Sequence, residues 1–328
     1  MLSGVTTVCF AGSYTVVFVL EISRLLFRSG IRGAIMIGFA AAGLLAHSAF
    51  LYYHVLKATG SPPPTEPPVS SGQYWCLLAA WCLVVVYLYL VYYHPRAPFG
   101  LFLMPLVLGL VGAGWWFAGR EPLAREPALR TWGVIHGVSI SLGAVSVLVG
   151  FAAGLMYLWQ SRRLKHKLAP ARGLRLPSLE WLDRTNSRAI VISVLMLGVG
   201  VVSGVILKFI NIRSETAGLP WNDPVVLSTL VWFGWLLITV VAGKLYRPAQ
   251  QGRKVAYLTV VSFVFLVIVL AVGLFVETHH WSRERIEDSG QKPVSTIHPP
   301  LSTIHYPLSS VHCPLSAVYP PPATGGAA

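Results

Sequence analysis

Eight long apolar runs recur along the first 276 residues, and they constrain the fold more than any other feature of the chain. They lie at about 4–26, 33–55, 74–93, 100–118, 133–159, 188–210, 225–243 and 255–276. A helix needs about 20 apolar residues to cross a hydrocarbon layer of ~30 Å, and only helices and closed barrels can bond their whole backbone in lipid. The runs lack the alternation of barrel strands. The sequence therefore predicts an all-α fold, a polytopic transmembrane helical bundle of about eight spans.

The charges in the connecting loops predict which side of the membrane each loop faces, because Lys and Arg collect in cytoplasmic loops. If the first, third, fifth and seventh loops share one side, they hold 16 of the 25 basic residues, and the other side holds 9. The 16 are Arg24, Arg28, Arg32, Arg96, Arg162, Arg163, Lys165, Lys167, Arg172, Arg175, Arg184, Arg188, Lys244, Arg247, Arg253 and Lys254. We therefore expect a multi-pass protein of the cell inner (plasma) membrane with both termini on the outer (periplasmic) side.

Composition divides the chain into two parts. Residues 1–281 form the predicted transmembrane domain, in which residues 177–184 could make a short helix on the inner surface. After Trp281 a seven-residue repeat appears, and a proline in every copy prevents a coiled coil. We expect residues 282–328 to be a disordered, low-complexity tail. We interpret the net charge of +13 as a signal of membrane topology and of attraction to a bilayer with anionic lipid. The sequence has no basic patch with interleaved aromatic residues, so we do not expect nucleic acid as a partner.

Two histidine positions are the main candidates for chemistry. His136 lies four residues after Trp132, about one turn inside the predicted outer surface. His279 and His280 follow the last span on the same predicted side, and we favour His279 as the one that faces the bundle. A lone histidine in a span can be a hydrogen-bonded packing residue, and histidines at a span end can be interfacial anchors. Because ionisable groups in the membrane need a partner or a function, two positions at matching depth favour metal ligation by both.

Between these histidines, a short loop carries Trp221 and Asp223. Asp223 and the following Pro224 have the pattern of a helix start, with Asp at the N-cap and Pro at the first helical position. Trp221 offers an aromatic surface instead, and Trp232 and Trp235 continue the aromatic series into the seventh span. The loop therefore predicts both a helix cap and a possible face for a flat ligand.

The order of histidine, Trp/Asp-Pro outer loop and histidine resembles the heme-handling membrane proteins of cytochrome c assembly, the CcsA/CcmC type, and especially their eight-span HemX-like members. The resemblance covers most of residues 1–281. It implies that His136 and His279 are the two axial metal ligands of a heme, with His280 as the alternative to His279. It also implies that Trp221 and Asp223 belong to the heme-binding loop.

The resemblance has implications for a further set of residues. His47 and His54 lie on one face of the second span. His47 resembles an inner heme-receiving histidine, with structural hydrogen bonding as the alternative. Basic residues in the outer loops are candidates to pair with porphyrin carboxylates, or are solvated loop charges. These are Arg120, Arg125, Arg130, Lys208 and Arg213.

We expect from this resemblance a heme-binding protein of cytochrome c biogenesis that holds or delivers heme at the outer face. It would be a non-enzymatic subunit of a cytochrome c synthase system, and its partners would be other assembly membrane proteins and apocytochrome c. Three alternatives remain open. They are a regulator or scaffold of heme biosynthesis without tight heme binding, a membrane cytochrome that transfers electrons through a bis-histidine heme, and a solute carrier.

Overall fold

The computed structural model describes residues 7–24, 31–59, 72–95, 97–119, 127–167, 176–213, 222–245 and 248–275. These residues form eight α-helices and one short 3₁₀ helix, and no strand occurs among them. The helices are α1 (Thr7–Ser23), α2 (Arg32–Thr59), α3 (Gly72–Tyr93), α4 (Gly100–Trp116), α5 (Pro127–Lys165), α6 (Leu179–Arg213), α7 (Pro224–Leu245) and α8 (Pro248–Phe275), with η3 (Phe117–Gly119) after α4. The all-α prediction is confirmed.

Each predicted span corresponds to one helix, but the lengths differ. Six helices are long and apolar enough to cross a membrane, whereas α1 and α4 have 17 residues each. Helices α5 and α6 have 39 and 35 residues, well beyond their predicted spans. The prediction of a separate surface helix at 177–184 is wrong, because most of that stretch is the first turns of α6. Apolar runs mark the part of a helix that lies in lipid, and polar turns can extend it at both ends.

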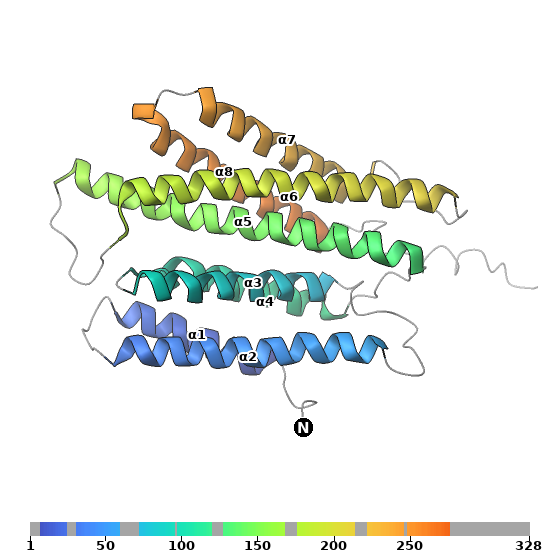
Figure 1. Ribbon diagram of the computed structural model, residues 1–328, viewed down its shortest axis with the longest axis horizontal. Coiled ribbons are helices and arrows are strands. Elements are labelled where there is room, and N and C mark those ends of the chain that lie inside the picture. The colour runs from blue at the N-terminus through green and yellow to red at the C-terminus, as the bar shows by residue number, and fades with distance from the viewer. Residues whose placement is uncertain are drawn as a thin grey trace, which may run out of the picture. The chain divides into compact units, whose positions relative to one another are not determined.

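The eight helices form two groups of four within one compact unit, Met1–Arg285. Helices α1 to α4 pack on one another through the pairs α1/α2, α2/α3, α3/α4 and α1/α4. Helices α5 to α8 pack through α5/α6, α6/α7, α7/α8 and α5/α8. Helix α5 joins the groups, since it also contacts α3 and α4 (Figure 1). The predicted tail at 282–328 lies outside the described residues.

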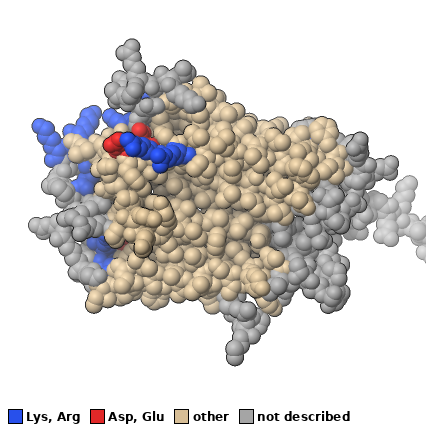
Figure 2. All heavy atoms as spheres, in the orientation of Figure 1, with Lys and Arg blue, Asp and Glu red and all other residues tan. Residues whose placement is uncertain are grey.

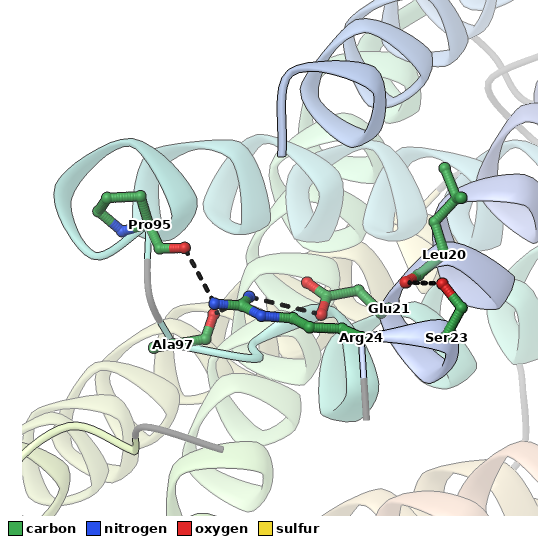
Figure 3. A network of polar contacts seen from close by, with 6 residues as sticks. All are labelled: Leu20, Glu21, Ser23, Arg24, Pro95 and Ala97. Carbon is green, nitrogen blue, oxygen red and sulfur yellow. Dashed lines mark hydrogen bonds and ion pairs between the residues drawn. The ribbon is translucent and has the colours of Figure 1, made fainter. Parts of the chain in front are cut away.

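Arg24, just after α1, links that helix to the connection between α3 and α4 and pairs with a buried carboxylate. Glu21 is 1% exposed, and its carboxylate lies 3.7 Å from the Arg24 guanidinium (Figure 3). Arg24 also donates hydrogen bonds to the carbonyl oxygens of Pro95 and Ala97, both at 3.2 Å. A Cβ on Gly100 would lie 2.5 Å from the Glu21 Cγ, so only glycine leaves room for the carboxylate there. An ionisable group inside a bundle requires such a partner.

Glycines allow α5 and α6 to approach closely over most of their length. A Cβ on Gly143 of α5 would lie 3.4 Å from the backbone nitrogen of Leu197, and one on Gly150 would lie 3.3 Å from the Cβ of Ala189. On α6, a Cβ on Gly200 would lie 2.8 Å from Ile140. Small residues at helix interfaces are the usual route to close packing in lipid, where no hydrophobic force drives helices together. The pairings define one antiparallel register for the two helices.

Positive charge gathers at one end of the bundle, which we call the basic end (Figure 2). This is the end at which α1 stops, α2 begins, α5 stops and α6 begins. The described basic side chains there are Arg24, Arg32, Arg162, Arg163, Lys165, Lys167, Arg184, Arg188, Arg253 and Lys254. Lys208 lies toward the opposite end, on the outward part of α6. The described members of the basic set counted in the sequence therefore share one end in three dimensions.

Candidate functional site

His136 lies on α5, in the half of the helix away from the basic end. Its Nδ1 is 2.7 Å from the carbonyl oxygen of Gly200 on α6. A carbonyl oxygen can only accept a hydrogen bond, so Nδ1 carries the proton and donates it. In the neutral imidazole, Nε2 therefore holds the lone pair. A backbone carbonyl that fixes the tautomer in this way is the usual support for a metal-ligating histidine.

The seat of His136 is a pair of glycines, Gly200 and Gly204, spaced as G-x-x-x-G on α6. A Cβ on Gly204 would lie 3.0 Å from the His136 Cε1 and 3.2 Å from its Nδ1, so the imidazole lies against the bare backbone. The hydroxyl of Ser203 lies 3.4 Å from the His136 Nδ1. This hydroxyl also donates a hydrogen bond to the Gly200 carbonyl, at 2.8 Å. Sequence reasoning missed these three residues, although the glycine spacing in an apolar run was the signal that could have found them.

The end of α8 reaches the level of His136. Helix α8 runs antiparallel to α5, with Gly154 facing Ala256, Gly150 facing Thr259 and the rings of Phe151 and Phe263 stacked at 3.9 Å. Continued outward at 1.5 Å per residue on both helices, this register brings the C-terminal end of α8 level with His136. The described residues of α8 end at Phe275, four residues before His279 in the sequence.

Asp223 is a helix cap, as predicted. Its Oδ1 accepts a hydrogen bond from the backbone N–H of Val225 at 2.8 Å, and α7 begins at Pro224. Its side chain is buried, at 1% exposure. A carboxylate at this position satisfies an otherwise open N–H and stabilises the positive end of the helix. The cap fixes the start of α7 at the same end of the bundle as His136.

Three of the predicted site residues, Trp221, His279 and His280, lie outside the described residues. Their predicted roles remain predictions. The deeper tryptophans of α7 are packing residues, since Trp232 is 1% exposed and Trp235 donates to Ser262 of α8 at 3.1 Å.

His47 has a different environment from His136. It is fully buried between α1 and α2, its ring is stacked on Phe10 at 4.1 Å, and its Nδ1 is 3.2 Å from the hydroxyl of Tyr14. Phe10 and Tyr14 belong to the first half of α1, the half away from the basic end. His47 itself lies near the middle of α2, and its role as an inner heme-receiving histidine stays a prediction. The ring contacts that the structure gives for His47 are with Phe10 and Tyr14, as expected of a packed histidine.

The other candidates divide according to their position. His54 stacks on Phe50 of its own helix at 4.6 Å. Lys208 lies on the same face of α6 as Gly200 and Gly204, one turn beyond the seat of His136. The remaining candidate cations, Arg120, Arg125, Arg130 and Arg213, have no described side chain. Trp75 of α3 is a further neighbour that the sequence did not suggest, because a Cβ on Gly137, next to His136, would overlap its ring.

The described part of the chain is thus a multi-pass helical membrane protein with one tautomer-fixed histidine near the end opposite its basic end. Residues 73–280 match the family model of the cytochrome C assembly proteins, and the chain belongs to that family. No curated protein matches the chain significantly. Membership supports a role in cytochrome c biogenesis.

The family match does not cover the two histidine regions equally. It begins at residue 73, within the first turn of α3, and extends to His280. His136, Asp223 and the pair His279/His280 therefore lie inside it, whereas α1 and α2 precede it. His47 and its partners Phe10 and Tyr14 belong to this preceding part. The match thus covers α3 to α8, which include α3 and α4 of the first group, and leaves α1 and α2 outside it.

Proposed function

We propose that this protein binds heme at the outer face of the membrane, through His136 and one histidine of the pair His279/His280, and passes it to the cytochrome c maturation machinery. The single observation that carries the proposal is the hydrogen bond from His136 Nδ1 to the Gly200 carbonyl. It directs the lone pair to Nε2, the nitrogen that would bind an axial position of the iron. Apocytochrome c and other assembly membrane proteins are the proposed partners.

Each of the residues around His136 would have a separate role in holding a heme. The Gly200 carbonyl would hold the imidazole by its hydrogen bond, and the bare backbone of Gly204 lets the ring lie against α6. Lys208, one turn outward on the same face, is the described cation best placed for a porphyrin carboxylate. The second ligand would come from the four or five residues that follow α8, a reach of at most about 14–18 Å. Heme would supply an iron with two axial positions and an edge open to apocytochrome thiols.

The proposed orientation in the membrane rests on the position of the basic end. Positively charged connections remain in the cytoplasm, so the end that carries His136 and the start of α7 is proposed to be periplasmic, with both termini on that side. Reporter fusions at Lys167 and at Gly290 test this, and they should report opposite sides of the membrane. Two cytoplasmic reporters would contradict the orientation and remove the outer-face assignment.

An absorption spectrum of the purified full-length protein tests heme binding. The wild type should show a strong Soret band that shifts on reduction, and His136→Gly should lower heme content about tenfold, in line with the loss of a ligand or its support. Added imidazole should restore part of the band, because it can occupy the vacated position. His94→Gln is the matched control, since His94 lies at the basic end against Trp181, and it should retain wild-type heme content.

Two further variants complete the test. Trp221→Ala should lower heme content without rescue by imidazole, because a small ligand cannot restore stacking area. The double variant His136→Gly/His279→Gly should be colourless. Wild-type heme content in that double variant would mean that the ligands lie elsewhere, with His280 and His47 as the next residues to replace. A colourless wild-type protein after growth with ample heme would contradict heme binding and favour the alternative function of a scaffold.

A further inference from the structure

A groove runs along the inner part of α5 at the basic end, with α4 and α8 as its walls. Its volume is about 650 Å³. The apolar part is formed by Phe102 of α4, Leu155 and Trp159 of α5, and Val260 of α8. The rings of Phe102 and Trp159 meet edge to face at 5.9 Å, and Trp159 is still 42% exposed. This aromatic wall is open at the lipid-facing surface of the helices, far along α5 from His136.

The same face of α5 changes from apolar to basic toward the helix end. Leu155 and Trp159 are followed at helical spacing by Arg162, Arg163 and His166, which line the other end of the groove. From Leu155 to His166 the helix rises about 16 Å. An apolar channel that ends in guanidinium groups at the helix end has the polarity of a phospholipid that stands in the leaflet.

Two guanidinium groups converge on one hydroxyl at this polar end. Arg162 of α5 and Arg253 of α8 both lie close enough to the Tyr257 hydroxyl to interact with it electrostatically. The two ion pairs within the described part of the chain involve Arg24 and Arg184, so neither Arg162 nor Arg253 has a carboxylate partner there. Like charges this close repel each other, and an anion between them removes the repulsion. Arg163 lines the same end and adds a third cation.

We propose that this groove binds one anionic phospholipid of the leaflet at the basic end. Its phosphate lies between Arg162, Arg163 and Arg253, and one acyl chain lies along Phe102, Trp159 and Val260. Guanidinium forks match phosphate oxygens in a bidentate manner, and basic pockets between transmembrane helices are typical sites for anionic headgroups. The site is separate from the proposed heme site at the other end of α5, and it does not depend on it.

Native mass spectrometry of the full-length protein, released from nanodiscs of equal phosphatidylglycerol and phosphatidylcholine, tests the proposal. The wild type should retain phosphatidylglycerol about tenfold over phosphatidylcholine, and Arg162→Gln/Arg253→Gln should reduce this preference to about twofold or less. Arg184→Gln/Arg188→Gln is the control, because it removes the same charge from exposed positions of α6 at the same end. An equal loss in both double variants would overturn the site and leave only general attraction to the basic end.

A second variant tests the apolar wall without any change of charge. Trp159→Ala should shorten the retention of phosphatidylglycerol while the headgroup preference of a short-chain analogue stays. Glycerol phosphate at the same concentration should not compete, because it lacks the chain. Full competition by glycerol phosphate would overturn the lipid assignment in favour of a free phosphate site. Loss of heme, with lipid retention unchanged, in the Arg162/Arg253 variant would overturn it in favour of porphyrin carboxylates.

Discussion

The helix pairs α1/α2 and α5/α6 each hold a histidine at their interface, and they treat it in opposite ways. In the first pair, His47 is enclosed by side chains, the ring of Phe10 and the hydroxyl of Tyr14. In the second pair, His136 rests on the bare backbone of Gly204 and is oriented by the carbonyl of Gly200. The aromatic side chains of α1 cover the ring of His47. The backbone of α6 instead orients the ring of His136 and leaves its other atoms to other neighbours. The comparison suggests a packing role for His47 and a ligand role for His136.

The largest expected effect comes from filling the backbone seat. Gly204→Leu places a side chain where the His136 imidazole lies, so heme content should fall about tenfold, as for lost ligand support. Overpacking should also destabilise the protein by about 1–3 kcal/mol. Gly234→Leu on α7 is the control, because a Cβ there meets nothing within 4 Å. The Soret absorbance per protein measures the effect, and wild-type absorbance in Gly204→Leu would remove the difference between the two histidines.

A second variant acts on the first helix group alone. Gly100→Val forces a side chain against the buried carboxylate of Glu21, which Arg24 holds in place, and should cost about 1–3 kcal/mol of stability. The Tm in detergent should fall, whereas Gly109→Val on the same helix, in open space, should leave it nearly unchanged. Heme content per folded protein should stay at the wild-type level. A selective loss of heme would show that the first group takes part in binding.

Tyr14→Phe tests the packing of His47 directly. The substitution removes the Tyr14 hydroxyl that hydrogen-bonds to His47 and keeps the aromatic ring. Stability should therefore fall by about 1 kcal/mol, the usual value for one hydrogen bond. Heme content should not change, because His47 is not the proposed ligand. Thermal unfolding and the Soret band are measured on the same sample. If the Soret band falls together with the Tm, His47 is a ligand and the contrast between the helix pairs is lost.

Ser203→Ala should have the smallest effect. The Gly200 carbonyl is the closer acceptor for His136, at 2.7 Å against 3.4 Å for the Ser203 hydroxyl. Stability should change by less than about 1 kcal/mol, with heme content close to that of the wild type. Ser193→Ala, another buried serine of α6 that donates to its own helix, is the control. A colourless Ser203→Ala would assign the orientation of His136 to the hydroxyl instead of the backbone.

Much of the fold could be predicted from local features of the sequence. Apolar runs predicted all eight helices because lipid imposes a minimum length on each span. The cap at Asp223 was also predictable, since an aspartate before Pro224 satisfies a backbone N–H that is close to it in sequence. The lengths of α5 and α6 were not, because their polar first and last turns carry no apolar signal.

The sequence by itself determined which residues lie in apolar helices and at which end the basic loops collect, because hydropathy and loop charge act within one segment. Only the tertiary structure decided what each histidine meets. His136 and Gly200 are 64 residues apart, and His47 and Tyr14 are 33 apart. The convergence of Arg162 and Arg253 on Tyr257 likewise requires α5 beside α8. Helix packing selects these partners, and the environment of an ionisable side chain depends on them more than on its neighbours along the chain.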